Sequence, residues 1–432
     1  MTNAGTAHPA RALLRLSIPA AVVGVAAALL LLGIYAVADA LEQVLWDVWP
    51  SAMGVSGDSA WWTFVILTLT GMAVGLVVWK VPGHGGPDPA TQSLVSPPMP
   101  LRVLPGLTLA LILMLAGGPS LGPENPILAL IIALTVVAGH RAQPAVGPTM
   151  WAGLATAGMV GALFGTPVAA ALILSGWLKS SEDKPLWDQL FAPLVAASAG
   201  AITVVLLEQP TFALAVAPFD GPEPIDLLTA SLIAVAAAAV GLAGVYAFGH
   251  VHRIFHTIAH PFLMLTAGGV ALGLLGAIGG QITLFRGVDQ MRELAANVED
   301  YTVAGLVLIV VVKLAALLVA ATSGFPGGHV FPAVFLGVAF GLLTNAVFAD
   351  IPAAVCVSAG VLGMVLAISR EGWLSLFIAI AVVGDVSLIP ILLLATLPTW
   401  LLLAGRPQMV IERAGASEQA AGDARPDGRQ AQ

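Results

Sequence analysis

Apolar residues lie along this chain of 432 residues in long blocks that short polar segments separate. Blocks of about 18 to 25 residues are long enough to cross the bilayer core as helices. They lack the alternating ten-residue pattern of a transmembrane β-barrel. The pattern predicts complete spanning helices at residues 18–38, 61–79, 190–207, 227–248, 261–285, 302–322 and 386–404. The predicted fold class is therefore all-α, in a polytopic membrane protein.

Other apolar stretches are short or broken. Residues 103–118 and 127–139 flank the polar segment 119–126, and residues 150–178 are interrupted at Gly165-Thr166-Pro167. Non-helical backbone at membrane depth is tolerated only where protein or a water-filled cavity covers it. Half-helices in matching positions of two halves indicate the binding site of a transporter.

Two motifs occur twice in the same order. The pattern G-x3-G-x3-P at 118–126 recurs at 324–332, and [ST]-A-G-x-x-G at 156–161 recurs at 358–363. The two matches predict an internal duplication, with membrane repeats at 16–208 and 209–409. A cytoplasmic segment, 1–15, precedes the repeats, and a polar tail, 410–432, is expected to be disordered.

Composition excludes several functions. Only 9% of the residues are charged and 58% are apolar, against about 25% charged in soluble domains, which excludes a water-soluble enzyme. The chain has no basic stripe, so no nucleic-acid partner is expected. The single cysteine, Cys356, excludes an intrachain disulfide and is predicted to be a buried apolar residue. No cofactor is predicted.

Arginines set the expected orientation. Arg11 and Arg15 precede the first span, and Arg406 and Arg413 follow the last. The positive-inside rule therefore places both termini in the cytoplasm, for a multi-pass protein of the inner or plasma membrane.

Glu124 is the only acidic residue between Asp88 and Glu182. A charge at membrane depth costs about 2.5 to 3.5 kcal/mol on insertion scales, so a functional role is the default interpretation. It lies before or within the first turn of the helix opened by Pro126, where free N–H groups favour negative charge. A permeating anion could replace the carboxylate there, which would make Glu124 a gate that protonation releases. The alternative is a glutamate that caps its helix in an exposed loop.

Two glycine-rich turns, at 81–88 and 324–332, could complete an anion site. Glycines let successive N–H groups converge on an anion without an intervening side chain. Ordinary membrane loops are the alternative interpretation.

Histidines and one lysine are further candidates. His252, His256 and His260 have the i, i+4, i+8 spacing of ligands on one helix face, but no His-Glu-x-x-His motif occurs and no acidic ligand is expected close by. We therefore do not expect a metal site there. Three interpretations are open for Lys313, which lies inside an apolar span. It is a functional countercharge, a member of an interior ion pair, or a side chain that snorkels to the membrane surface. The segment 179–188 is expected to be a solvated connection.

These motifs resemble those of the CLC family of chloride channels and proton-coupled chloride antiporters, in its bacterial YfeO-like branch of ion-transport proteins. The family has a GSGIP-like loop, a G-[KR]-E-G-P loop with the gating glutamate, and a GxFxP loop, in that order. The matching segments are Gly83–Pro87, Gly122–Pro126 and Gly328–Pro332. The resemblance covers about residues 15–410.

The resemblance implies an inverted repeat of full and partial tilted helices, and a homodimer with one pore per subunit in the membrane lipid. It implies that Glu124 is the gate and that His84 occupies the place of the central anion-binding serine. The implied anion-binding positions are His84, Gly85, Gly122, Pro123, Gly328, His329, Val330, Phe331 and Met409.

Three departures bear on the transported ion. His84 can donate a hydrogen bond and also carry charge. Met409 follows the C-terminal motif where the family has its pore tyrosine. Gly176 or Trp177 falls where the antiporters have an internal proton glutamate, and Glu182 or Asp183 could substitute only if the helix continues that far. Passive conduction, exchange of an anion for a proton by another path, and export of fluoride or another anion all fit these residues.

Two other classes of function are alternatives. A secondary transporter of a cation or an organic solute would use Glu124 to bind its coupling ion. A membrane-embedded enzyme would need a paired catalytic constellation, and no metal motif or second acid accompanies Glu124. The sequence therefore favours transport of an inorganic anion such as chloride or fluoride, by a channel or by an anion/proton exchanger, and not an enzyme.

Overall fold

The computed structural model describes residues 9–92, 97–177, 185–208, 213–217 and 219–411. Nine helices in this part are long and apolar enough to cross a membrane. The first half forms α1 (Pro9–Gln43), α2 (Trp49–Ala52), α3 (Ala60–Lys80), α4 (Leu104–Gly117), α5 (Glu124–Ala142), α6 (Pro148–Phe164), α7 (Pro167–Trp177) and α8 (Leu186–Glu208).

The second half repeats this series of helices. It forms α9 (Pro224–Phe255), α10 (Pro261–Gly279), α11 (Val288–Ala296), α12 (Val303–Thr322), α13 (Val330–Val347), α14 (Ala353–Ser369), α15 (Gly372–Val383) and α16 (Ile389–Leu403). The all-α prediction is confirmed.

Helix boundaries follow local backbone chemistry. The break predicted inside 150–178 separates α6 from α7, because Gly165 adopts a left-handed φ of 64° and Pro167 opens the next helix. The span predicted at 261–285 was too long, since Gly280, with a φ of 75°, ends α10. The helix α1 begins at Pro9, within the predicted N-terminal segment 1–15, whose cytoplasmic position stays a prediction. Residues 178–184 and 412–432 of the predicted connection and tail lie outside the described residues.

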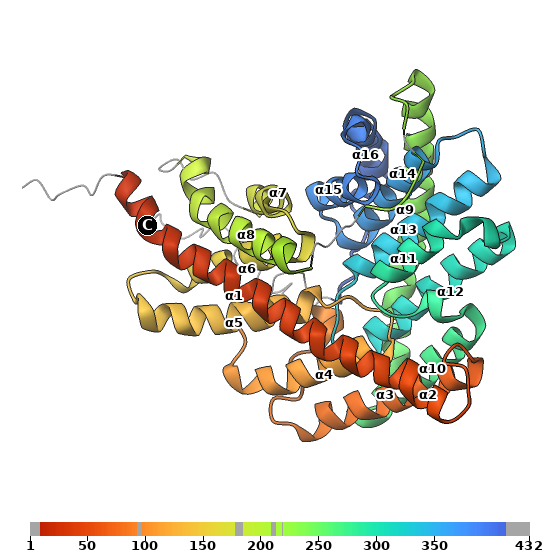
Figure 1. Ribbon diagram of the computed structural model, residues 1–432, viewed down its shortest axis with the longest axis horizontal. Helices are drawn as coiled ribbons and strands as arrows, with labels where there is room; N and C mark the ends of the chain where they lie inside the picture. Colours follow the sequence, from red (N-terminus) through yellow and green to blue (C-terminus); the bar gives the residue numbers. More distant parts are fainter. Residues whose placement is uncertain (1–8, 93–96, 178–184, 209–212, 218, 412–432) are drawn as a thin grey trace, which may run out of the picture.

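Helices of the two halves occupy corresponding places. In the first half α1 packs against α6 and α8, and in the second α9 packs against α14 and α16. Likewise α5 packs on α6, and α13 packs on α14. Figure 1 shows α5–α8 on one side of the molecule and α9 and α11–α16 on the other, with α3 beside α10, while the long α1 runs diagonally from the first side across to α2.

The two copies of the first motif are joined directly. Gly122 donates its N–H to the Gly328 carbonyl oxygen at 3.0 Å, and Gly328 donates to the Gly122 oxygen at 2.7 Å. A reciprocal antiparallel bridge relates two segments by a local two-fold rotation. Because these glycines are also equivalent positions of the repeat, the bridge lies on the axis of an inverted repeat. The repeat limits at residues 208 and 209 stay a prediction.

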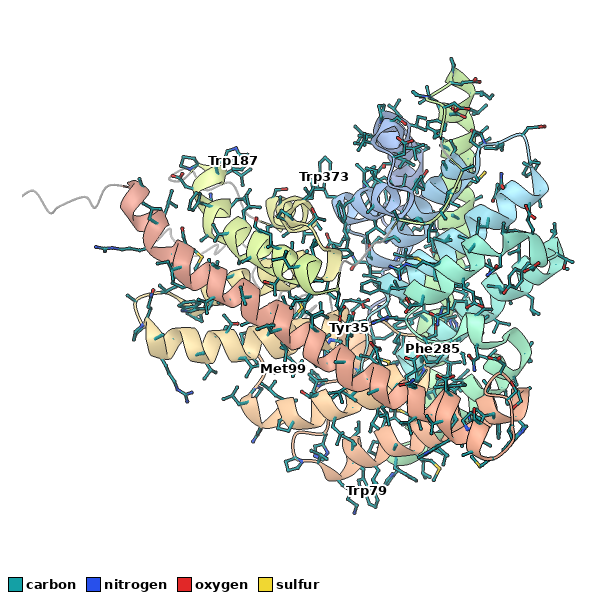
Figure 2. The ribbon with its side chains drawn as sticks, viewed as in Figure 1. Tyr35, Trp79, Met99, Trp187, Phe285 and Trp373 are labelled. Carbon is teal, nitrogen blue, oxygen red and sulfur yellow. The ribbon has the colours of Figure 1, made fainter. Side chains whose placement is uncertain are left out.

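Apolar and aromatic side chains cover the outside of the helices. Trp79, Trp187 and Trp373 are exposed and lie at the periphery, whereas Tyr35 and Phe285 lie in the middle of the molecule (Figure 2). Peripheral tryptophans are typical of the boundary between lipid and water. Cys356 is buried, as predicted.

Glycines let α3 of the first half pack closely against α10 of the second half. A Cβ on Gly71 of α3 would lie 2.5 Å from the Leu265 carbonyl oxygen and 2.9 Å from the Cα of Gly269, both on α10. A Cβ on Gly33 of α1 would have no atom within 4 Å, so Gly33→Ala is the matched control.

We expect Gly71→Ala to destabilise the protein by about 1 to 3 kcal/mol, the usual cost of overpacking, although alanine favours helices by roughly 0.5 to 1 kcal/mol over glycine. Thermal unfolding in detergent would show a lower midpoint for Gly71→Ala than for Gly33→Ala. Equal midpoints would contradict the close α3–α10 contact.

Candidate functional site

Glu124 is the first residue of α5 and its side chain is buried, with 2% exposed. Its Oε1 accepts a hydrogen bond of 2.7 Å from the backbone N–H of Val330, the first residue of α13. The backbone of Phe331 also interacts with the carboxyl group. Its Oε2 is buried and accepts no hydrogen bond within the described part of the chain. The alternative of a capping glutamate in an exposed loop is therefore wrong.

A second helix also holds the carboxylate. Glu124 is the first residue of α5, as predicted, and its carboxyl group interacts with its own backbone, but the hydrogen bond to Oε1 comes from α13 in the other half of the chain. The Gly122–Gly328 bridge is the reason, because it places the starts of α5 and α13 side by side. Glu124 thus contacts Val330, the residue equivalent to itself in the repeat.

Two glycines leave room for the carboxylate. A Cβ on Gly328 would lie 2.5 Å from Glu124 Cγ and closer still to the carboxyl group. A Cβ on Gly122 would lie 2.9 Å from Glu124 Cδ. Neither glycine has a left-handed φ, so what requires glycine at both positions is the space that the carboxylate fills.

The first glycine-rich loop, Gly83–Pro87, follows α3 and turns through left-handed conformations at Gly83, His84, Gly85 and Gly86. A constricted cavity joins this loop to the other two motifs. Its lining includes Gly85, Pro87, Asn125, Pro126, Pro326 and Gly327. The three predicted loops therefore meet at one place.

The His84 side chain does not line this cavity. It is exposed, and its Nδ1 lies 3.0 Å from the carbonyl oxygen of Val78, in the last turn of α3. His329, in the third loop, is buried, and its ring packs edge-on against Phe248 of α9, with 5.7 Å between the ring centroids. Anion-binding roles for both residues stay predictions.

The C-terminal segment contacts the chain just after the first loop. Met409 is buried, and the N–H of Ile411 donates to the carbonyl oxygen of Ala90 at 2.8 Å. Arg370 fastens this segment by donating to the carbonyl oxygens of Leu403 and Pro407, at 2.8 and 2.7 Å. Sequence reasoning missed Arg370, although a lone arginine between two apolar helices was a visible signal.

A larger cavity, of about 710 Å³, opens beside the C-terminal part of α1. Its lining includes Tyr35, Asp39, Glu42, Asp47, Arg286 and Asp289. The guanidinium of Arg286 lies 4.4 Å from the centre of the Tyr35 ring, and Tyr35 is close enough to Glu124 for the two side chains to interact electrostatically. Burial lowers the pKa of Arg286, but Tyr35, Asp289 and Asp39 raise it by more, so the guanidinium stays charged.

Lys313 supports the loop that borders this cavity. It is buried in α12 and donates to the carbonyl oxygens of Leu284 and Phe285, at 2.7 and 3.0 Å. Phe285 in turn donates its N–H to the Gly118 oxygen at 2.8 Å. The partners of Lys313 are thus backbone carbonyls, and the snorkelling interpretation is wrong.

The predicted position of a proton glutamate holds Gly176. This glycine lines a cavity of about 270 Å³ between α7 and the start of α15, and Glu371 lines the same cavity. An acidic residue from the other half of the chain thus lies at the same cavity, where sequence spacing did not indicate one. Glu182 and Asp183, the substitutes considered above, lie outside the described residues.

The three histidines of the predicted helix face do not stay together. His252 and His256 both contact Asp88, so the expectation that no acidic ligand is near was wrong. His260 packs separately against the Trp79 ring, with 4.9 Å between the ring centroids.

Comparison with known proteins decides the family. The family model described as voltage gated chloride channel matches residues 70–402. The chain belongs to this family. Its members are transporters and channels, so the chain is a multi-pass ion-transport protein and not an enzyme.

Two curated relatives match almost the whole chain. The protein named "Putative ion-transport protein YfeO" of Escherichia fergusonii is 49% identical over 407 residues, which are 94% of this chain and 97% of that one. The protein of the same name in Escherichia coli K12 (DH10B) is 48% identical over the same shares. The predicted resemblance to the CLC family and its YfeO-like branch is confirmed.

Solved structures share the fold. A CLC-type fluoride/proton antiporter superposes with a TM-score of 0.74 at 18% identity, covering 92% of this chain and 97% of that chain. A slow cyanobacterial Cl⁻/H⁺ antiporter gives 0.77 at 16% identity, covering 91% and 96%. The CLC-like inverted-repeat architecture is therefore confirmed.

Proposed function

We propose that this protein moves an inorganic anion, of the chloride or fluoride class, across the membrane in exchange for protons, with the Glu124 carboxylate as its gate. The observation that carries the proposal is the hydrogen bond from Val330 N–H, at the beginning of α13, to a buried carboxylate. The N-terminus of a helix binds anions through its free N–H groups and its dipole. A permeating anion of the same charge would compete with Glu124 for this position.

Protonation would release the gate. A neutral carboxyl group loses its charge-assisted hydrogen bond with the Val330 amide, and such bonds are about twice as strong as neutral ones. The second oxygen of Glu124 has no hydrogen bond in the described structure that would hold the side chain in place. Gating would therefore depend on pH.

Two cavities lie near Glu124: the neighbouring Asn125 and Pro126 line the constricted one, and Tyr35, which interacts electrostatically with Glu124, lines the larger one. The larger cavity lies by the end of α1, and the constricted cavity by the loop after α3. Because α1 and α3 are successive spans, these two places lie toward opposite faces of the membrane. An anion that passes from one cavity to the other would meet Glu124 on its way.

Acidic side chains on both sides of Glu124 favour proton exchange over passive conduction. Asp39, Glu42 and Asp289 line the larger cavity. Glu371 follows Arg370, which binds the C-terminal segment through the carbonyl oxygen of Pro407. That segment contacts Ala90, just after the first loop, so Glu371 lies toward the membrane face at which this loop lies. The two solved antiporters named above exchange fluoride or chloride for protons, which supports the same proposal for this chain.

The experiment that tests the proposal is efflux from proteoliposomes loaded in turn with chloride, fluoride and nitrate, with simultaneous recording of the external pH. We expect efflux of at least one anion, together with a rise in external pH, because protons enter as the anion leaves. Protein-free liposomes and exchange of K⁺ for a large organic cation are the controls. Anion efflux without a pH change would contradict proton exchange and indicate passive conduction. Flux that depended on the identity of the cation would favour the cation-transporter alternative.

The homodimer, the contacts with lipid and the cytoplasmic position of both termini stay predictions from the family resemblance and the arginine distribution. Chemical crosslinking in the membrane, and labelling of a cysteine placed at either end, would test them.

A further inference from the structure

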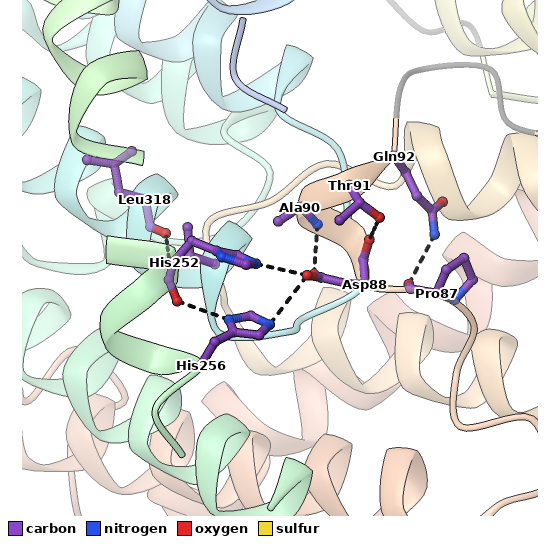
Figure 3. Close-up of polar contacts among 9 residues, drawn as sticks. Pro87, Asp88, Ala90, Thr91, Gln92, His252, His256 and Leu318 are labelled. Atoms are coloured by element: carbon purple, nitrogen blue, oxygen red, sulfur yellow. Dashed lines mark hydrogen bonds and ion pairs between the residues drawn. The ribbon is translucent and has the colours of Figure 1, made fainter. Parts of the chain in front are cut away.

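Three side chains that are distant in sequence converge next to the first loop. Asp88 immediately follows that loop, and His252 and His256 lie one turn apart at the C-terminal end of α9. The Oδ2 of Asp88 lies 2.9 Å from Nε2 of His252 and 3.3 Å from Nε2 of His256. Figure 3 shows the carboxylate facing both imidazole rings.

Hydrogen bonds of Asp88 Oδ1 and His256 Nδ1 to the backbone orient these two side chains, so that Asp88 Oδ2 and His256 Nε2 face each other. Asp88 Oδ1 accepts from the N–H of Ala90 at 3.0 Å, which leaves Oδ2 free for the histidines. His256 Nδ1 lies 3.0 Å from the backbone carbonyl oxygen of His252. A carbonyl oxygen only accepts, so the proton of a neutral His256 ring is on Nδ1.

With its proton on Nδ1, a neutral His256 directs the lone pair of Nε2 toward a carboxylate oxygen 3.3 Å away. Two acceptor atoms that face each other at this distance have the arrangement of two ligands of one cation. The two imidazole rings are stacked, with 3.7 Å between their centroids, so both lie beside the same carboxylate.

A single bound metal ion would make the contact between His256 Nε2 and the Asp88 carboxylate favourable. Metal-binding histidines usually donate their other ring N–H to a backbone carbonyl, as His256 does here. With ligand bonds of about 2.0 to 2.2 Å, atoms around a tetrahedral zinc ion are roughly 3.4 Å apart. The three candidate ligand atoms all lie within 4.8 Å of one another, so small side-chain movements would suffice.

We propose that Asp88, His252 and His256 bind one divalent transition-metal ion of the zinc class, with water in the fourth position. Two imidazoles and one carboxylate are a ligand set that zinc takes readily, and the partly exposed cluster leaves the remaining position open to solvent. The bound ion would fasten the first loop to α9. The same helix reaches the third loop through the contact of Phe248 with His329, so the ion would fix the relative position of two of the three motifs.

The test is binding of Zn²⁺ to the full-length protein in detergent, with any oligohistidine tag removed, measured by competition with a chromophoric chelator. We expect one high-affinity ion per chain. Replacing one ligand, as in His252→Ala, His256→Gln or Asp88→Asn, should weaken binding by at least about 10- to 100-fold, a loss already seen when only an outer-shell partner is removed. The measurement does not depend on transport, so its failure and that of the proposed function are distinguishable.

His250→Ala is the matched control, because this exposed histidine lies on the same helix and bonds only to the carbonyl oxygen of Tyr246. It should bind Zn²⁺ like the unmodified protein. His256 is exposed, so His256→Gln should keep the fold, which the elution volume and the unfolding midpoint would verify. Absence of stoichiometric binding by the unmodified protein, or equal affinity in His250→Ala and His256→Gln, would overturn the proposal.

Discussion

Replacing Glu124 with alanine is expected to leave anion efflux active at a rate that no longer changes with pH. The variant frees the N–H of Val330 and removes the negative charge that competes with the passing anion. The efflux of the unmodified protein should instead rise with falling pH, by up to about tenfold per pH unit while one carboxyl group titrates. The measurement is efflux from proteoliposomes buffered across the range from about pH 4 to pH 8, in which carboxyl groups of proteins titrate.

Glu124→Gln separates the charge of the gate from its size. Glutamine resembles the protonated side chain in shape, so its efflux should also be independent of pH. Asp188→Asn is the control, because this aspartate is exposed in the first turn of α8, away from the site. It should keep the pH response of the unmodified protein. A pH response that survived in both Glu124 variants would remove Glu124 from the gate.

Gly328→Ala is expected to displace the Glu124 side chain and to destabilise the protein. The three atoms nearest to an added Cβ all belong to Glu124, and Cγ would lie only 2.5 Å away. Overpacking of this kind costs about 1 to 3 kcal/mol. Because the displaced carboxylate can no longer reach Val330, the efflux of this variant should resemble that of Glu124→Ala.

A double-mutant cycle gives this prediction its sharpest test. In Glu124→Ala the three clashing atoms are absent, so the further change Gly328→Ala should cost less there than in the unmodified protein. We expect a coupling energy of about 1 to 2 kcal/mol between the two sites, within the range found for residues in contact. The midpoints of denaturant or thermal unfolding in detergent would supply the four stabilities.

Gly327→Ala is the matched control for the cycle. A Cβ on Gly327 would lie 2.5 Å from Leu121 Cβ and 3.1 Å from the Gly122 carbonyl oxygen, and Glu124 is not among its near neighbours. Its cost should therefore be the same with and without Glu124. If Gly328→Ala were equally additive, the carboxylate would not occupy the space that the structure gives it.

The helices were predictable because each depends on local sequence. An apolar block of sufficient length must satisfy its backbone hydrogen bonds internally in lipid, and only a helix does so within one segment. The break at Gly165 and Pro167 followed from the conformations of those two residues alone. The end of α10 was misplaced because apolar residues continue beyond Gly280, and hydrophobicity does not show where the backbone turns.

The site was predictable only in part. Glu124 stood out because a lone acid in an apolar segment is costly, and the recurrence of its motif indicated the second half of the site. Arg370, Glu371 and the acids around Arg286 were missed. Each of them acquires its role from a neighbour in another part of the chain, as when Arg370 binds the carbonyl of Pro407.

The sequence by itself determined that the chain is helical and lies in a membrane, that it contains an internal repeat, and that Glu124 is its central ionisable group. Only the tertiary structure decided that Glu124 also binds the N-terminus of α13, and that Asp88 meets His252 and His256. The physical reason is the distance along the chain over which each interaction acts. Hydrophobicity and helix formation act over one turn or one span, whereas these contacts join atoms 206 and 164 residues apart, which only the packing of the two repeats brings together.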